Sequence, residues 1–305
     1  MIRIITDTTA GLPQEIVDEF NIPMVPQYIH FGEETVRDSF DMSPAEFYAR
    51  QAVTAELPKT SAPSVGDFIT LFTAILREDP AATLLCIHPS AEVSGTVRSA
   101  RPAALQLADE FPEADIRILD SRSISIGLGL MVWEACRMAR EGASADVIME
   151  RMALMRDNMT VYFVVDTLEY LAKGGRIGRA AHLLGALLDI KPILTLVDGT
   201  VESFAKARTR GRSIAAMQAL VIDGVREQRS NGSLRLGVAH AICEDEACLL
   251  ADALCAALNP EIFLLAELGP SIGVHAGPRT LAVCWVRVPC TFPSNLAAVP
   301  VMRSY

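Results

Sequence analysis

The chain has 305 residues, of which 50% are hydrophobic and 21% are charged, and its formal net charge is -10. This length and composition predict a soluble globular protein with two domains, and they exclude a disordered or fibrous chain. The acidic balance argues against broad binding to nucleic acid or to an anionic membrane, but it leaves room for a local basic patch and a transient membrane contact.

The first 166 residues alternate strand patterns with helix patterns. A β-hairpin is expected within residues 24–37, and Ser43 to Glu46 carry the Ser-x-x-Glu capping pattern of a helix start. Alternation of this kind implies a parallel sheet covered on both faces. Strands are expected at residues 2–6, 83–87, 116–119 and 159–165, and helices at residues 12–20, 64–77, 95–111 and from about residues 124 and 144.

The pattern changes after Asp166, where we expect the domain boundary. Residues 167–190 read as helix interrupted at Gly174-Gly175, and Asp198-Gly199 predicts the turn of a second hairpin. Helices on a largely antiparallel sheet are expected up to residue 288. Residues 289–305 hold three prolines and predict an irregular tail.

The sequence has seven cysteines, which is an odd number, and no two of them form a CxxC pair. Most lie in apolar runs, which favours a reduced, cytoplasmic setting over a disulfide framework. Metal-ligand spacings are absent, so we expect no metal site. The first residues read as a β-strand and not as a signal peptide, and no apolar run reaches the ~20 residues needed to cross a bilayer.

Four segments concentrate small hydroxyl residues and glycines: residues 59–64, 90–96, 174–178 and 269–278. The second follows a buried strand and precedes a helix, so it lies at the carboxyl end of the sheet, where ligands usually bind. Free N–H groups at the helix start suit an anion, and Ser94 adds a hydroxyl donor. The alternative is that Ser94 only caps the helix, and spacing alone favours that alternative.

Capping is also the simpler interpretation of Thr60, Ser61 and Ser64. His275 lies among glycines and prolines in an expected loop, where a histidine is as often functional as structural. Arg176 is either a turn residue or an anion clamp. The run of basic residues from Lys206 to Arg212 is either a solvated face or a docking patch. The other four histidines, His30, His88, His182 and His240, are expected to be structural.

The motifs of phosphate-binding loops and of zinc proteases are missing. The sequence has neither a GxxxxGK[ST] nor an HExxH motif, and Gly127-Leu128-Gly129 lacks the third glycine of a dinucleotide-binding loop. An enzyme is therefore poorly supported. A phosphotransferase or acyl hydrolase that uses Ser94 and His275, and a sensor of a small anionic ligand, are two interpretations that the residues leave open.

Eight motifs in order resemble the DegV family, from the N-terminus to about residue 285. The resemblance implies the DegV (EDD) fold, which is an α/β, Rossmann-like parallel-sheet domain at residues 1–166 and an α+β domain at residues 167–288. A β-hairpin insertion is expected at about residues 24–42. The motifs lie at residues 6–13, 26–31, 60–64, 94–96, 120–123, 174–177, 191–194 and 272–278.

Membership of this family implies a bacterial, cytoplasmic, non-enzymatic carrier that holds a long-chain fatty acid in a buried tunnel between its two domains. Some members are the binding subunit of a fatty acid kinase and present the carboxylate to a separate ATP-binding partner. The fatty acid is the ligand, and no other cofactor is implied.

The motifs also carry over roles for individual residues. Thr60, Ser61, Ser94 and Gly95 are expected to bind the carboxylate, with His275 beside the head group. Arg176 is expected near the head group or at the kinase surface. The sequence departs from the family pattern at Ala62, where Gln is common, and at Arg279-Thr280, where a further glycine is usual. These departures affect the fine geometry of the two loops.

Overall fold

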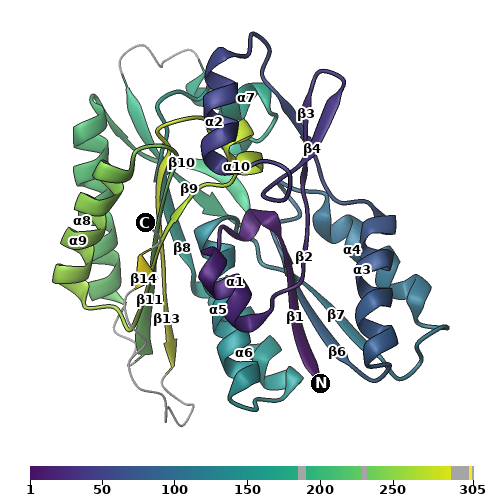
Figure 1. Cartoon of the computed structure of the whole chain (residues 1–305). Coiled ribbons are helices and arrows are strands. Elements are labelled where there is room, and N and C mark those ends of the chain that lie inside the picture. Colours follow the sequence, from purple (N-terminus) through teal and green to yellow (C-terminus); the bar gives the residue numbers. More distant parts are fainter. Residues whose placement is uncertain (185–189, 229–231, 290–301, 304–305) are drawn as a thin grey trace. The chain divides into compact units, whose positions relative to one another are not determined.

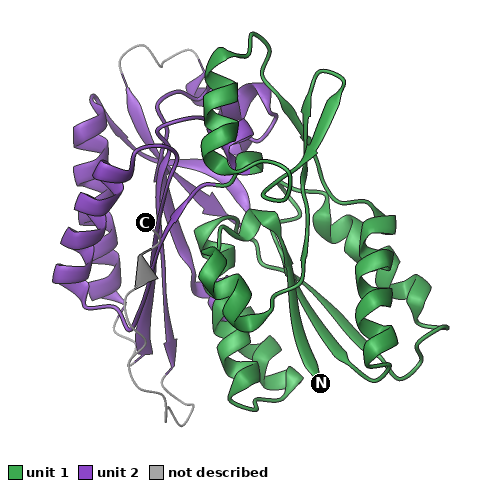
Figure 2. Cartoon of the chain, in the orientation of Figure 1, with its two compact units in different colours: residues 1–153, 269–271 green, residues 154–268, 272–305 purple. Residues whose placement is uncertain are grey.

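The computed structural model describes residues 1–184, 190–228, 232–289 and 302–303, and the chain forms two compact units (Figure 1, Figure 2). Unit 1 comprises Met1–Ala153 and Gly269–Ser271, and unit 2 comprises Leu154–Leu268 and Ile272–Tyr305. The division at Ala153 precedes the boundary expected near Asp166. The reason is the strand at Thr160–Val164, which pairs within unit 2.

A four-stranded parallel sheet forms the centre of unit 1, in the order β2-β1-β6-β7. Its strands are β1 (Ile2–Asp7), β2 (Met24–Val25), β6 (Thr83–His88) and β7 (Asp115–Asp120). β6 is almost entirely buried, as its continuous apolar sequence requires of a strand covered on both faces. Residues 24–25 were expected within the hairpin but instead form the edge strand β2, paired with β1.

Helices cover both faces of this sheet (Figure 1). α3 and α4 pack on each other over one face, and α5, which is buried along nearly its whole length, contacts β1 and β6. Ser43 and Ser64 each form a complete capping box, as the sequence predicts for Ser43. The helices are η1 (Thr8–Ala10), α1 (Gln14–Phe20), α2 (Pro44–Val53), α3 (Val65–Glu78), α4 (Thr96–Leu107), α5 (Ile126–Arg140) and α6 (Ala145–Asn158), of which η1 is a 3-10 helix.

A small antiparallel sheet, in the order β4-β3-β5, carries the predicted hairpin. The hairpin strands are β3 (Tyr28–Phe31) and β4 (Glu34–Arg37), and β5 (Lys59–Ser61) adds to the free edge of β3. The hydroxyl motif at residues 59–64 therefore begins on a strand and ends at the first turn of α3.

The sheet of unit 2 is mixed, with the order β10-β9-β8-β13-β11-β12-β14. β8 was expected in the first parallel sheet, but it pairs antiparallel with β9 and β13. Sequence pattern alone misplaced it because a buried strand has the same apolar run in either kind of sheet. The strands are β8 (Thr160–Val164), β9 (Lys191–Val197), β10 (Thr200–Ala207), β11 (Gly232–His240), β12 (Ile262–Glu267), β13 (Leu281–Pro289) and β14 (Met302–Arg303).

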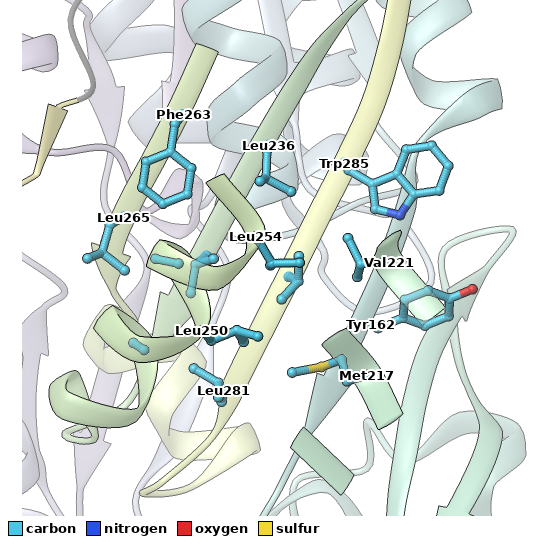
Figure 3. Close-up of a cluster of buried hydrophobic side chains, with 14 of the residues drawn as sticks. Tyr162, Met217, Val221, Leu236, Leu250, Leu254, Phe263, Leu265, Leu281 and Trp285 are labelled. Carbon is cyan, nitrogen blue, oxygen red and sulfur yellow. The ribbon is translucent and has the colours of Figure 1, made fainter. Parts of the chain in front are cut away.

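Two long helices cover one face of this sheet and enclose the core of unit 2 (Figure 3). Leu236 and Trp285 from the strands meet Val221 and Leu254 from these helices in one apolar cluster. The helices of the unit are α7 (Glu169–Lys173), the 3-10 helix η2 (Gly178–Leu183), α8 (Arg210–Glu227), α9 (Glu244–Leu258) and α10 (Pro270–Ala276), whose first two residues belong to unit 1.

The opposite face of the same sheet is largely apolar, with the buried Arg235 as an exception, and its central side chains are small. Register pairs Gly237 with Cys284 and Ala239 with Ala282, and Ala239 pairs with Ala266 on its other side. Strand side chains alternate between faces, so these residues point away from the helix-covered cluster. Larger buried side chains surround the small ones on this face: Val161, Phe163, Leu194, Leu264 and Val286.

The predicted fold class is confirmed, with a Rossmann-like parallel sheet in unit 1 and an α+β arrangement in unit 2. The tail is not wholly irregular, because Met302–Arg303 pairs with β12. Of the helix expected at residues 167–190, residues 185–189 lie outside the described part. No helix in the described ranges combines the length and apolar character that crossing a membrane requires.

Candidate functional site

A cluster of hydroxyl groups lies at the carboxyl end of the parallel sheet in unit 1. β6 ends at His88, and the following loop leads through Ser90 and Ser94 into α4, which begins at Thr96. Ser90 and Thr96 are fully buried and Ser94 is 9% exposed. Parallel strands bind ligands at this edge, so the structure places Ser94 where the sequence predicts a site.

Ser94 is bonded to the start of α4 without being its N-cap residue. Gly95 is the N-cap and makes no side-chain cap, whereas Thr96 N donates to Ser94 Oγ at 3.3 Å. Ser94 Oγ also lies 2.8 Å from Thr96 Oγ1. A hydroxyl can accept two hydrogen bonds and donate one, so this helix contact leaves Ser94 able to bind a ligand as well.

Thr96 is in turn hydrogen-bonded to Gln27 and Asp7, two buried residues that lie much earlier in the sequence of unit 1. Gln27 Nε2 donates to Thr96 Oγ1 at 2.8 Å and to Asp7 Oδ2 at 3.0 Å. Thr9 donates to Asp7 Oδ1 through its backbone N–H at 2.8 Å and through its hydroxyl. Burial raises the pKa of Asp7 to about 6, although the hydrogen bonds from Thr9, Thr96 and Gln27 oppose the rise.

Thr60 and Ser61 lie close to this cluster, because the next residue in the chain, Ala62, contacts it at Gly95. A β-carbon on Gly95 would lie 3.2 Å from Ala62 Cβ, so the two predicted motifs are in contact. Thr60 and Ser61 are successive strand residues, and their side chains therefore point to opposite faces of the small sheet. Thr60 pairs with the buried Ile29, whereas Ser61 is exposed.

Ser61 Oγ lies 2.8 Å from Nε2 of His30 on the exposed face of the small sheet. Thr60 and Ser61 are predicted to bind one carboxylate together. Strand side chains alternate, so the two hydroxyls lie on opposite faces of the small sheet, and the Ser61 hydroxyl is bonded to His30. Neither residue caps α3, because Ser64 does so.

The end of β7 and the residues just after it form hydrogen bonds to the loop that contains Ser90. Asp120 accepts hydrogen bonds from Arg122 N at 2.9 Å and from Ala91 N at 3.4 Å, and Ser90 N donates to Ser123 O at 2.8 Å. Residues 120–123, one of the motifs of the family resemblance, therefore hold the loop at residues 90–96 in place. The loop is attached to β7 by these bonds as well as to β6, the strand that it follows.

In unit 2 the structure brings Arg176 and His275 together. α7 ends at Gly174, and Gly175 has φ 70° while Arg176 N donates to Leu171 O at 2.9 Å, which is a Schellman helix end. Arg176 Nη1 donates to Gly174 O at 2.8 Å. A β-carbon on Gly174 would overlap His275 Nδ1, so the ring lies directly against this helix end.

His275 lies in the last turn of α10 and not in the expected loop. The glycines and proline around it had suggested a loop, but the helix is short and ends at Ala276, before Gly277 with φ 78°. Burial, together with the positive charge of Arg176, lowers the pKa of His275 to about 4. The ring is therefore neutral at pH 7 and can bind a ligand only as a hydrogen-bonding group.

The basic run of residues 206–212 is divided in the structure. Arg210 turns inward, with Nη2 at 2.6 Å from Glu246 Oε2 and Nη1 at 3.7 Å from Asp166 Oδ1. Lys206, Arg208 and Arg212 stay exposed. A docking patch on this segment would therefore present three exposed positive charges and not the four that the sequence suggested.

A polar pocket of about 870 Å³ lies in unit 2 at the carboxyl ends of β11 and β12. His240 and Glu267 are register partners there, and Glu244 to Glu246 form the first turn of α9, where carboxylates offset the positive helix end. Across the described ranges, no three His, Cys, Asp or Glu side chains converge as a metal-binding group.

Sequence reasoning missed Asp7, Gln27 and Thr96 as parts of the site, although all three lie inside quoted motifs. A carboxylate, an amide and a hydroxyl in otherwise apolar surroundings were the available signal, because buried polar groups need partners. The small residues of β11 and β13 were missed as well. Their signal was the alternation of small with larger residues from Leu281 to Trp285.

Comparison with known proteins identifies the family. The family model described as an uncharacterised protein of the DegV family matches residues 1–288. Protein DegV of Bacillus subtilis is 32% identical over 286 residues, which cover 93% of this chain and 98% of that protein. The crystal structure of DegV from Bacillus subtilis, a fatty acid binding protein, has a TM-score of 0.84 and 30% identity, with 94% of this chain and 99% of that chain covered.

A fatty-acid-binding DegV family protein from Thermus thermophilus has a TM-score of 0.84 and 32% identity, again with 94% of this chain and 99% of that chain covered. The match thus extends over both units and includes all the motifs described above. The chain belongs to the DegV family.

Proposed function

We propose that this protein binds a long-chain fatty acid without transforming it. The observation that carries the proposal is Ser94, a nearly buried hydroxyl at the start of α4, on the edge where a parallel sheet binds ligands. The two solved relatives above, at 30% and 32% identity, are fatty-acid-binding proteins, which supports the same ligand class here.

The carboxylate is bound by Ser94, by Thr60 and by the backbone N–H groups at Gly95. A carboxylate removed from water needs several donors, since burying it unpaired costs several kcal/mol. α4 has 12 residues, so its N-terminus adds a partial positive charge that favours an anion. Ser61 contributes only through its place in the strand, because its hydroxyl is bonded to His30.

His275 and Arg176 have supporting roles that we carry over from the family motifs. The neutral His275 ring acts as a hydrogen-bonding group beside the head group, and Arg176 supplies a positive charge near it or at the kinase surface. The contact of His275 with Gly174 supports joint action of these residues, since it joins the two motifs in one place.

The acyl chain packs on the face of the unit 2 sheet that carries small side chains. Gly237, Ala239, Ala282 and Cys284 are small, and the larger side chains named above around them are apolar. Burial of a chain is worth about 0.8 kcal/mol per CH₂, so sixteen carbons contribute on the order of 10 kcal/mol before entropic costs.

The carrier then presents the carboxylate to a separate ATP-binding kinase subunit in the cytoplasm. None of the six cysteines that the structure describes forms a disulfide bond, which supports a reducing compartment. Acyl phosphate should form only when carrier, kinase subunit and ATP are present together. Turnover of an acyl ester or acyl phosphate by the carrier alone, lost in Ser94→Ala, would establish an enzyme instead.

Extraction and mass spectrometry of the full-length protein test the binding function. Purified protein should release long-chain fatty acid at close to one molecule per chain, and the delipidated protein should rebind it. Ser94→Ala and Thr60→Val should each weaken rebinding by about tenfold, because each removes one hydrogen bond to a charged group. Ser99→Ala, on the same helix, is the control. A stable protein that neither carries nor rebinds fatty acid would refute the proposal.

A further inference from the structure

The polar pocket of unit 2 lies at the carboxyl end of a second pair of parallel strands. β11 and β12 are parallel neighbours, and α9 connects them and packs against both (Figure 1). His240 and Glu267 are the register partners that end this pair. They follow Val238 and Leu265 by two residues, so both side chains lie on the face that α8 and α9 cover. Open α/β sheets usually bind their ligands at this edge.

The first turn of α9 differs in charge from that of α4. α4 begins without an acidic residue, which suits an anion, whereas α9 begins with Glu244, Asp245 and Glu246. The dipole of α9 alone accounts for acids at its start. It does not account for Glu267, which comes from β12 and whose pKa is raised by burial and by the charge of Glu244. Carboxylates from two elements therefore line one pocket.

One of these four carboxylates is neutralised within the protein. Glu246 Oε2 lies 2.6 Å from Arg210 Nη2, and Glu246 Oε1 lies 3.4 Å from Nη2 of Arg279, which also lines the pocket. Asp166 lies near the same two arginines. Within the described part of the chain, the other three carboxylates, which include Glu267, form no ion pair with a lysine or an arginine. The pocket is therefore suited to a cation and not to an anion.

His240 adds a buried hydrogen-bonding atom to the wall of the pocket. The residue is 7% exposed, and among the residues that the structure describes its Nδ1 has no hydrogen-bond partner. Burial lowers the pKa of His240, although the charge of Glu244 opposes the change, so the ring is neutral at pH 7. A neutral imidazole can accept a hydrogen bond, and buried polar atoms in proteins normally have a partner.

The dimensions of the pocket point to an organic cation. In the ranges that the structure describes, His, Asp and Glu side chains do not converge closely enough to hold a metal ion. The volume of about 870 Å³ is that of a small-molecule site. Ile242, which is 52% exposed, gives the wall an apolar side chain. Methylene groups can pack on Ile242 while cationic groups of the same molecule bind the carboxylates.

We propose that this pocket binds a short aliphatic polyamine, whose ammonium groups donate hydrogen bonds to His240 Nδ1 and to the carboxylates of Glu244, Asp245 and Glu267. Three carboxylates without an arginine or lysine partner favour a ligand with several cationic groups over one with a single charge. The proposal does not depend on fatty acid binding, because all four residues belong to unit 2 and none is assigned to the fatty acid.

Isothermal titration of the full-length protein with spermidine tests the proposal. We expect one spermidine to bind per chain. Glu267→Gln should weaken binding about tenfold, since the amide keeps the shape of the side chain but loses a charge-assisted hydrogen bond. His240→Phe, which removes the acceptor, should also weaken it. Glu227→Gln is the matched control, because it removes the same charge from an exposed residue outside the pocket and should change the affinity less than about twofold.

A second titration separates a free polyamine from a lysine side chain of a partner protein. Nα-acetyllysine amide carries a single ammonium group and should bind about tenfold more weakly than spermidine, because it forms fewer charge-assisted hydrogen bonds. Absence of spermidine binding, equal losses in Glu267→Gln and Glu227→Gln, or binding of the lysine amide as tight as that of spermidine would overturn the proposal. Extraction of fatty acid from the same protein decides the proposed function separately.

Discussion

Ser271 donates two hydrogen bonds to Oδ2 of Asp38, 233 residues earlier in the chain, through its backbone N–H at 3.3 Å and through its hydroxyl. Asp38 also accepts from Thr8 Oγ1 at 3.2 Å and from Ser39 Oγ at 2.8 Å. These bonds lie within unit 1, which includes the first two residues of α10.

Asp38→Ala should strongly destabilise the protein, because it leaves the buried donors of Thr8 and Ser271 unpaired. We expect the free energy of unfolding to fall by about 2–4 kcal/mol, measured by urea denaturation. Asp41→Ala is the matched control, since Asp41 is an exposed carboxylate bonded to Arg37, and its unfolding midpoint should stay unchanged. Equal losses in both variants would contradict the role assigned to Asp38.

Asp7 predicts a specific pH dependence of stability. Its pKa is about 6 in the folded protein against 3.8 as the ordinary value, so the folded state binds the proton more tightly than the unfolded state. Stability from this group is complete below pH 3.8 and is lost as the pH rises to about 6, by roughly 3 kcal/mol in total. Asp7→Asn should remove this loss.

Urea denaturation of the delipidated protein between pH 4 and pH 7 measures this pH-dependent loss of stability. The difference in unfolding free energy between Asp7→Asn and the unmodified protein should grow as the pH rises. Parallel curves for the two proteins would show that Asp7 does not titrate in this range.

Gly174→Ala should displace His275, because the added methyl group overlaps Nδ1 of the ring. The backbone at Gly174 suits alanine, with φ -76° and ψ -7°, so steric conflict is the only expected cost. Gly175→Ala is the matched control. It strains a residue with φ 70° but has no atom within 4 Å of the new carbon.

The imidazole resonances of His275 report the difference between these two variants. Only Gly174→Ala should shift them and raise the pKa of the ring from about 4 toward its ordinary value, since the ring would leave its buried position beside Arg176. A similar shift in Gly175→Ala would mean that the helix end moves as a whole.

Glu134 on α5 forms a buried ion pair with Arg151 on α6. Substitution of Glu134 should reveal how much this pair matters for stability. Its carboxylate lies 3.0 Å from Arg151 Nη1 and 3.7 Å from Arg137 Nη1. Glu134→Ala leaves two buried guanidinium groups uncompensated and should cost about 3–5 kcal/mol in urea denaturation. Glu150→Ala, an exposed neighbour on α6, should have no measurable effect. A loss below 1 kcal/mol for Glu134→Ala would show that water compensates the arginines.

The small-residue face of the unit 2 sheet predicts chain-length selectivity. Ala239→Leu adds bulk on this face and should weaken binding of hexadecanoic acid more than binding of octanoic acid, by about tenfold in the ratio. Ala251→Leu adds the same bulk to the helix-covered core and should reduce stability without changing the ratio. Isothermal titration with both acids makes the comparison. Equal ratios in the two variants would place the acyl chain elsewhere.

The sequence by itself determined most local elements of this protein. Capping at Ser43, the turn at Asp198-Gly199 and the buried run of β6 depend on residues close together in the chain, so their physics can be read without the fold. The motif around Ser94 also predicted a loop at the carboxyl edge of the parallel sheet, because a strand followed by a helix start defines that edge wherever it occurs.

Only the tertiary structure decided which of these residues act together. β8 joined the second sheet, Ser61 turned away from Thr60, and His275 settled in a helix against Gly174. Gln27 reached Thr96 across 69 residues of chain, and the two side chains form a hydrogen bond of 2.8 Å. A hydrogen bond requires two atoms within about 3 Å in the right orientation, and spacing along a sequence carries no information about that distance until the chain has folded.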